Sequence, residues 1–198
     1  MEKRRKVSNP LALAAMAWLV RGPMHPYELG RRLQETGMDR SIKYNRGSLY
    51  MVVEQLRKAG FVVEQETVRE GQRPERTVYA LTDQGRAELY DWMRELVAEP
   101  RHEYPYFGVA LSLLSVLDPG EAAELLGRRL ETLTAEVEET RAGMQALLDG
   151  GLLWIFQIEE KYRLTVLEAE QRFVTELIDS LRRPGHAEAW QELFRSDT

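Results

Sequence analysis

One stretch constrains the fold more than any other part of this 198-residue chain: KYNRGSLYMVVEQLRKAGFV, residues 43–62. Within it, Leu49, Val53 and Leu56 recur at helical spacing behind Asn45, whose side chain is a favourable helix N-cap. Gly60 then ends the helix, and β-branched residues follow at once. A helix that runs through a glycine turn into a strand predicts a small mixed unit, in which a hairpin packs on a few helices.

Two shorter helices are predicted ahead of this stretch. The apolar run at residues 11–20 follows Asn9 and Pro10, a typical N-cap and first helical residue. Its basic start imitates a secretory signal, but the run is too short to span a bilayer, so we expect a core helix and no membrane segment. Leu29 and Leu33, one helical turn apart, indicate the second helix.

A β-hairpin is predicted from residues 61–68 and 76–82, which are rich in β-branched and aromatic residues and flank the turn-forming segment REGQRPE. The order of three helices and a hairpin predicts a winged helix-turn-helix. A fourth helix is expected to begin at Thr82 or Asp83 and to end before Pro100.

The remainder is expected to be helical, which makes the fold class mainly α. A short apolar helix is predicted in YFGVALSLLSVL, followed by two long helices separated at Gly150 and Gly151. We therefore expect a winged helix-turn-helix with its linking helix at residues 1–98. Residues 99–198 are expected to form a helical domain for dimerisation and possible effector binding, with its long helices antiparallel.

Heptad-like spacing of apolar residues marks both long helices. We expect a homodimer that uses seven of these positions: Leu126, Leu133, Val137, Tyr162, Val166, Phe173 and Leu177. An antiparallel pair of the two helices would still leave Leu167, Val174 and Ile178 uncovered, which indicates a second subunit. Burial of these residues against the preceding helices is the alternative.

Charge is divided unequally along the chain. Residues 1–90 contain 16 Lys/Arg and 11 Asp/Glu, whereas residues 91–198 contain 11 and 21. A basic half in a chain with a net charge of -5 indicates a surface for a polyanion on that half, although an ordinary fluctuation of surface charge is the alternative. The absence of cysteine excludes disulfides, zinc-thiolate sites and thiol catalysis, and it fits a cytoplasmic protein.

Enzymatic chemistry has little support in the sequence. His25, His102 and His186 are scattered, and the chain contains no HExxH motif, phosphate loop, nucleotide-binding glycine pattern or nucleophile elbow. We therefore predict no catalytic residues, no cofactor and no metal site.

Double-stranded DNA is the predicted partner of the basic half. A recognition helix reaches base edges with its N-terminal residues, while arginines and lysines nearby bind phosphates or the minor groove. Twelve residues form the predicted DNA surface: Asn45, Arg46, Gly47, Ser48 and Tyr50 at the helix start, Arg69, Arg73 and Arg76 at the hairpin tip, and Lys3, Arg4, Arg5 and Lys6 in the tail. The alternative is a role as helix cap or solvated turn, and for Tyr50 packing against the second helix.

A small-molecule effector is possible at Trp154 and Phe156, which could line a pocket for a flat molecule at the dimer junction. Aromatic residues at helical spacing are more often core residues, so packing is the alternative.

Four segments, HPYELGRRL, GSLYMVVEQLRKAGFV, TVYALTDQGRAEL and YFGVALSLLS, resemble the PadR family of bacterial transcriptional regulators, in the branch with the larger C-terminal domain. The resemblance implies a homodimer on a palindromic operator. Members of the family are commonly repressors, and some of them are released from DNA by small aromatic or drug-like molecules. It puts Gly47, Ser48, Leu49 and Tyr50 at the start of the recognition helix, whereas Met51 departs from a pattern that usually has proline. A winged helix that serves only protein contacts is the alternative, but it would not need arginines at both the helix start and the hairpin tip.

Overall fold

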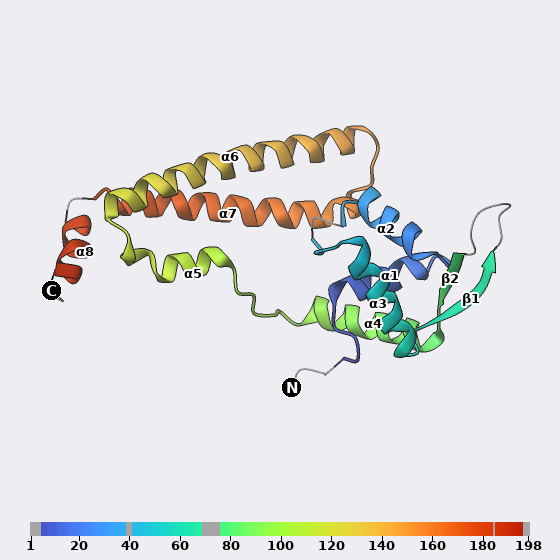
Figure 1. Cartoon of the computed structure of the whole chain (residues 1–198). Coiled ribbons are helices and arrows are strands. Elements are labelled where there is room, and N and C mark those ends of the chain that lie inside the picture. The colour runs from blue at the N-terminus through green and yellow to red at the C-terminus, as the bar shows by residue number, and fades with distance from the viewer. Residues whose placement is uncertain (1–4, 39–40, 69–75, 184, 196–198) are drawn as a thin grey trace. The chain divides into compact units, whose positions relative to one another are not determined.

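The protein is described by a computed structural model that covers residues 5–38, 41–68, 76–183 and 185–195 (Figure 1). Its elements are α1 (Pro10–Leu19), α2 (Pro26–Glu35), α3 (Arg46–Lys58), β1 (Val62–Val68), β2 (Arg76–Leu81), α4 (Asp83–Ala98), α5 (Tyr106–Ser112), η2 (Leu114–Val116), α6 (Pro119–Asp149), η3 (Trp154–Gln157), α7 (Ile158–Leu181) and α8 (His186–Arg195). The mainly helical fold class with one antiparallel hairpin is confirmed. Contacts divide the chain into two compact units, residues 1–102 and 103–198.

Helix α1 lies at the centre of the N-terminal unit. Asn9 caps it, because its side-chain oxygen accepts a hydrogen bond of 2.9 Å from the backbone N–H of Leu11. Leu11 and Met16 are completely buried, as expected for a core helix. They share one hydrophobic core with apolar residues of α2, α3, β1 and α4. Within the described ranges, no helix is both long and apolar enough to cross a membrane.

The hairpin is held to the helices by a contact that the sequence did not reveal. Strands β1 and β2 are antiparallel, with Val62 opposite Leu81 and an irregularity between Gln65 and Val68. Met24, in the loop between α1 and α2, forms an isolated bridge with Tyr79 of β2, through two backbone hydrogen bonds of 3.0 Å. The bridge fixes the base of the wing next to the start of α2.

The end of α3 and the start of α4 meet at two glycines. Gly60 has φ of +81°, a left-handed conformation that turns the chain from α3 into β1. The Thr82 hydroxyl donates to the carbonyl of Gly60 at 2.8 Å and accepts from the N–H of Gly85 at 3.0 Å, so it joins the turn to the first turn of α4. Gly85 is buried directly against the backbone of Phe61.

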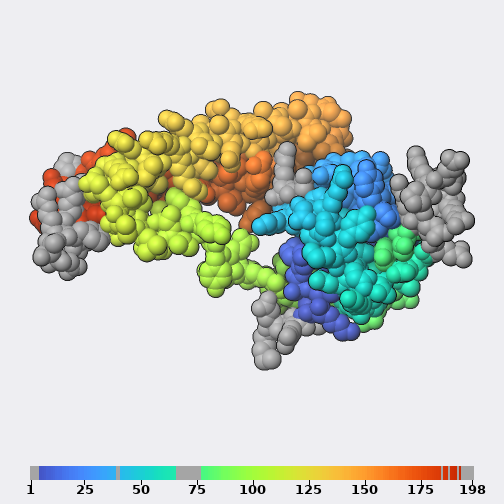
Figure 2. Space-filling view, viewed as in Figure 1, coloured from blue at the N-terminus to red at the C-terminus, as the bar shows by residue number. Residues whose placement is uncertain are grey.

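The C-terminal unit is built on the antiparallel pair α6 and α7, which lie in contact along their length (Figures 1 and 2). Apolar residues of α5 and η2 and Trp190 of α8 pack against this pair. The short helix α8 was not predicted. The core of the unit contains Ala122, Leu126, Leu133, Val174, Ile178 and Leu181.

The structure corrects part of the predicted dimer surface. Three of the predicted residues pack within the chain and are not available to a second subunit, because their exposure is only 4% for Leu126, 6% for Leu133 and 3% for Val137. Leu177 is partly buried against the same core. These positions follow a heptad rhythm because they stabilise the α6–α7 pair itself.

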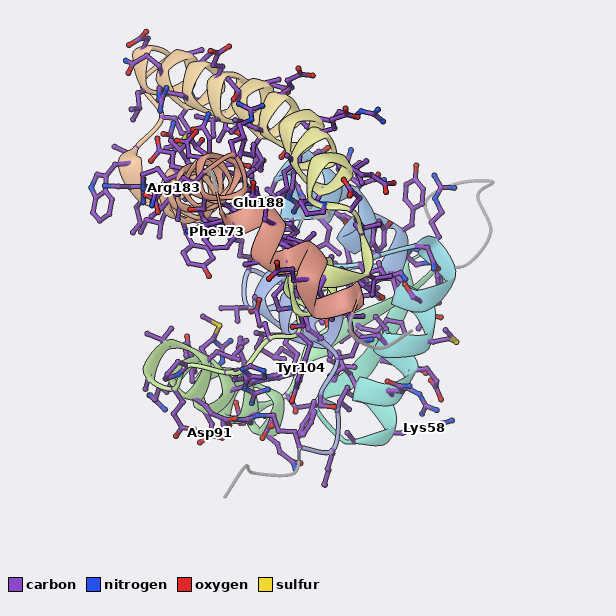
Figure 3. The ribbon with its side chains drawn as sticks, turned by 90° about the vertical axis from the view of Figure 1, so that its left-hand side faces the viewer. Lys58, Asp91, Tyr104, Phe173, Arg183 and Glu188 are labelled. Carbon is purple, nitrogen blue, oxygen red and sulfur yellow. The ribbon has the colours of Figure 1, made fainter. Side chains whose placement is uncertain are left out.

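Helix α7 carries two apolar stripes, and only one of them is buried within the chain. The inner stripe, formed by Leu167, Val174, Ile178 and Leu181, packs against α6, although three of these residues were expected to stay uncovered. The outer stripe, formed by Tyr162, Val166 and Phe173, is 69%, 46% and 45% exposed. Figure 3 shows the Phe173 side chain on the side of α7 that is turned away from α6.

Candidate nucleic-acid interface

The start of α3 is fixed by a reciprocal capping box. The Asn45 side-chain oxygen accepts from the N–H of Ser48 at 2.8 Å, and the Ser48 hydroxyl accepts from the N–H of Asn45 at 3.0 Å. The same hydroxyl donates to the Asn45 carbonyl at 2.7 Å. Capping thus engages the Asn45 side-chain oxygen and the Ser48 hydroxyl, and it defines a firm helix start at which Arg46 and Gly47 are exposed.

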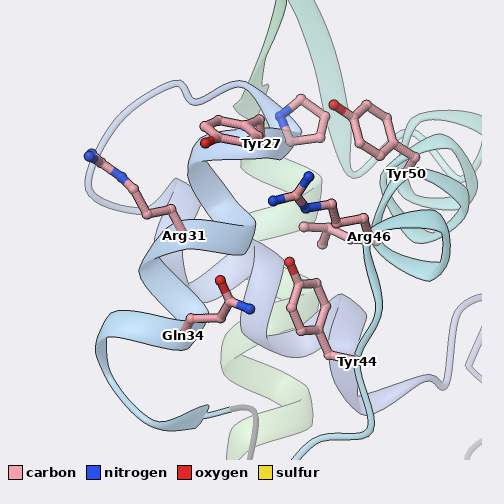
Figure 4. Close-up of a pocket in the computed structure, with 8 residues that line it drawn as sticks. Tyr27, Arg31, Gln34, Tyr44, Arg46 and Tyr50 are labelled. Atoms are coloured by element: carbon pink, nitrogen blue, oxygen red, sulfur yellow. The ribbon is translucent and has the colours of Figure 1, made fainter.

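Arg46 projects over a shallow pocket between α2 and α3 (Figure 4). Its guanidinium carbon lies 5.7 Å from the centroid of the Tyr27 ring, a cation–π distance. The pocket has a volume of about 170 Å³ and is lined by Pro26, Tyr27, Arg31, Gln34, Tyr44, Arg46, Leu49 and Tyr50. Three phenol rings and two guanidinium groups therefore surround the same depression.

Tyr50 combines the two roles considered for it. Its ring meets the edge of the His25 ring, with centroids 6.1 Å apart and planes at 74°, so it packs against the N-cap of α2. The residue is nevertheless 48% exposed. It lies one turn after Arg46, within reach of anything that binds at the start of α3.

The other arginines of α2 and α3 have carboxylates within the chain at ion-pair distance. Arg57 donates to both carboxylate oxygens of Glu54 at 2.7 and 2.8 Å, and this hydrogen bonding lowers the pKa of Glu54. Arg31 and Arg32 have the carboxylate of Glu35 within 3.6 Å. For Arg46, no carboxylate in the described part of the chain lies at ion-pair distance, so its charge is directed outward.

Arg5 does not belong to a DNA-binding tail. Its guanidinium donates to Glu88 at 2.6 Å, to Asp91 at 3.1 Å and to Glu95, and it lies over the ring of Trp92 at 5.4 Å. Only 2% of the side chain is exposed. The prediction of a DNA contact is therefore wrong for Arg5. Its guanidinium forms ion pairs with three carboxylates of α4, and these ion pairs hold the N-terminal segment against that helix.

The other predicted basic contacts are placed only in part. Lys6 is exposed next to the buried Arg5. Arg76 is the first residue of β2, with its backbone paired to Val68. Four of the predicted residues lie outside the described residues: Lys3, Arg4, Arg69 and Arg73.

Replacing Arg5 with alanine is expected to lower the free energy of unfolding by about 2 kcal/mol, because three carboxylates would lose their common cation. The hydrogen bond from Arg5 lowers the pKa of Glu95. A lowered folded-state pKa contributes stability above the unfolded pKa of Glu, about 4.3, and this contribution disappears as the pH falls through the folded pKa. Thermal unfolding between about pH 7 and pH 2 measures the effect.

The difference between wild type and Arg5→Ala should therefore shrink towards low pH. Lys6→Ala is the matched control, since this exposed neighbour carries the same charge and should leave the melting temperature unchanged. An equal loss for both variants would contradict a specific role of the Arg5 cluster.

The predicted effector residues lie on the surface of the C-terminal unit. Trp154 and Phe156 belong to η3 and are 69% and 65% exposed, so neither is a core residue within the chain. Next to them, buried Gln157 donates from Nε2 to the carbonyl of Met144 at 3.0 Å and fixes the turn between α6 and α7. In the ranges that the structure covers, no three His, Asp or Glu side chains converge as metal ligands would.

Sequence reasoning missed four residues that complete the site, three on α2 and one just before α3. Tyr27, Arg31, Gln34 and Tyr44 line the pocket but were not predicted to contribute to it. A signal was present, because Tyr27, Arg31 and Gln34 recur at spacings of four and three, which places them on one face of α2. Their meeting with α3 depends on the packing of the two helices.

Known proteins similar to this chain are transcriptional regulators. Residues 16–91 match the family described as the transcriptional regulator PadR-like family. The negative transcriptional regulator PadR of Bacillus subtilis (strain 168) is 25% identical over 139 residues, which cover 70% of this chain and 75% of the relative.

Solved structures share the fold across most of the chain. The crystal structure of Bacillus subtilis PadR in complex with operator DNA has a TM-score of 0.65 at 23% identity and covers 87% of this chain and 98% of that chain. The structure of the same protein with p-coumaric acid has a TM-score of 0.60 at 20% identity, with coverage of 83% and 98%. This family consists of regulators rather than enzymes, which confirms the expectation of a non-enzymatic protein. Residues 16–91 of the chain therefore resemble the PadR-like family of transcriptional regulators.

Proposed function

We propose that the protein is a sequence-specific DNA-binding regulator, a homodimeric repressor of a palindromic operator. The observation that carries the proposal is the exposed start of α3, where Arg46 lies on a firmly capped helix without a carboxylate partner in the described residues. Arginine in this position of a recognition helix can donate two hydrogen bonds to guanine O6 and N7. Gly47 lets the backbone approach the groove, and the hairpin wing reaches flanking phosphates.

The dimer is proposed to form through the outer stripe of α7. Tyr162, Val166 and Phe173 leave a contiguous apolar surface that a monomer would expose to water. A two-fold symmetric pair would hold two α3 helices about 34 Å apart, one turn of B-DNA, and would match a palindrome. A DNA-binding surface on the N-terminal unit alone also agrees with the basic excess of residues 1–90.

Release from DNA is proposed to follow binding of a small aromatic molecule near the exposed Trp154 and Phe156. Support comes from the p-coumaric acid complex of Bacillus subtilis PadR. A regulator of this kind acts on the bacterial chromosome, so we expect it in the cytoplasm.

Arg46→Ala is expected to reduce the preference for operator over random DNA by about 1–3 kcal/mol, roughly five- to 150-fold, because a bidentate base contact is lost. Fluorescence anisotropy titrations with both DNAs measure this ratio. Arg57→Ala is the matched control on the same helix: its charge is already balanced by Glu54, so the ratio should stay at the wild-type value. A ratio that Arg46→Ala leaves unchanged would contradict the assigned base contact.

The whole proposal is tested by titrating the protein with DNA from upstream of its own gene, beside a scrambled competitor, at two salt concentrations. Specific binding predicts a higher affinity for the upstream DNA and a steep loss of affinity for both DNAs as salt rises. Equal affinity for the two DNAs would remove sequence specificity. No affinity for either would favour a protein-interaction module. Repeating the titration with p-coumaric acid tests release.

A further inference from the structure

We propose that Tyr27 is a positioning residue for Arg46: its ring holds the guanidinium in the orientation that reads the operator. This inference rests on the proposed function, because it concerns how the same site achieves specificity. Arg46 lies on α3 and Tyr27 on α2, so the contact joins the two helices of the helix-turn-helix (Figure 4).

The Tyr27 ring projects from a part of α2 that is fixed. His25 caps this helix, with Nδ1 accepting from the N–H of Tyr27 at 3.0 Å. Pro26, at the first helical position, is buried. Just before His25, Met24 is anchored to the wing by its bridge with Tyr79. The backbone of Tyr27 is therefore fixed at the start of α2, and its ring can serve as a rigid platform.

The packing of Tyr44 against α2 also shapes the pocket in which Arg46 lies. The Tyr44 hydroxyl packs over Gly30 of α2, at a distance that leaves no room for a Cβ on that residue. Tyr44 thereby forms one wall of the pocket below Arg46 in Figure 4, and Leu49 also lines this pocket. The guanidinium lies over the Tyr27 ring, Tyr44 lines the same pocket, and no carboxylate of the described residues lies at ion-pair distance from Arg46.

Positioning matters because an arginine side chain has many rotamers. Fixing a free arginine against a base costs conformational entropy, up to about 2 kcal/mol for a side chain of this kind. A ring that already restrains the guanidinium reduces this cost before DNA arrives. Tyr27 is 52% exposed, so its ring contacts the cation and still remains accessible to solvent.

Two substitutions separate the ring from the hydroxyl. Tyr27→Leu removes the aromatic face, and we expect the operator-over-random preference to fall about two- to fivefold, as for an exposed cation–π contact. Tyr27→Phe keeps the face and should retain the wild-type preference. Tyr90→Leu is the matched control, since this exposed tyrosine of α4 does not line the pocket and should have no effect. Melting temperatures exclude a loss of folded protein.

The decisive measurement is a double-mutant cycle between the two residues, with operator preference as the readout. In the Arg46→Ala background, Tyr27→Leu should cause no further loss, because the group that it positions is absent. Additive losses would overturn the inference, as would a loss of affinity for all DNA by Tyr27→Phe, which would assign the hydroxyl to a phosphate. If the single variant Arg46→Ala keeps the wild-type operator preference, the proposed base contact is wrong. If Arg46→Ala lowers the preference but Tyr27→Leu does not, only the positioning role of Tyr27 is wrong.

Discussion

Gly85→Ala is expected to destabilise the protein by about 3 kcal/mol, the largest stability change that we predict for a single methyl group. A Cβ at this position would collide with the carbonyl oxygen of Phe61 and lie 2.8 Å from its carbonyl carbon and 2.9 Å from Cδ1 of Leu81. Backbone atoms cannot move aside as a flexible side chain would, so α4 would have to shift away from the α3–β1 turn. The hydrogen bond between Thr82 and Gly85 would be strained by the same movement.

Thermal unfolding followed by circular dichroism measures this loss, which corresponds to a decrease in melting temperature of roughly 6–12 °C for a chain of this size. Gly143→Ala is the matched control within α6, because a Cβ there has no atom within 4 Å. Alanine in a helix interior should stabilise it by about 0.5–1 kcal/mol. A Gly85→Ala variant as stable as wild type would show that the close approach of α4 to Phe61 is not present in solution.

Phe173→Asp is expected to convert the proposed dimer into a monomer and to reduce operator affinity by at least about 100-fold. A carboxylate within this apolar interface would be buried without a partner, at a cost of several kcal/mol. The monomer would then have one α3 in place of two, and the contribution of the second half-site would be lost. Analytical ultracentrifugation and operator titration on the same sample measure both effects.

Thr175→Asp provides the control for helix α7. Thr175 is exposed, and two residues along a helix it lies about 200° around the axis from Phe173. This variant introduces the same charge into the same helix and should remain dimeric. A Phe173→Asp protein that is still dimeric would place the interface elsewhere on the C-terminal unit, and a wild-type monomer would remove the palindromic mechanism.

Local signals predicted much of the N-terminal unit. Asn9 and Asn45 were identified as N-caps, and both side chains accept hydrogen bonds at the first turns of their helices. Gly60 was identified as a helix end and adopts a positive φ. Such features depend on a few consecutive residues, and their geometry is the same in any fold. For this reason the elements of the winged helix could be predicted without coordinates.

Contacts between distant segments could not be predicted in this way. Arg5 lies in a run of four basic residues, which suggested a polyanion partner, yet its partners are carboxylates more than 80 residues away. Composition records only that a charge is present. Whether it meets water, DNA or a neighbouring helix depends on where the chain brings an opposite charge. The same reason explains why Tyr27 was missed as a neighbour of Arg46.

Sequence alone determined that α7 is a long helix with more apolar surface than one partner can cover. Only the tertiary structure decided which surface faces α6. Val166 of the outer stripe and Leu167 of the inner stripe lie about 100° apart around the axis, and helical periodicity treats the two stripes as equivalent. The inner stripe was selected because Val174, Ile178 and Leu181 complement Ala122, Leu126 and Leu133 in one core. Periodicity fixes the spacing of buried residues along a helix, whereas the shape and volume of the neighbouring side chains fix its rotation.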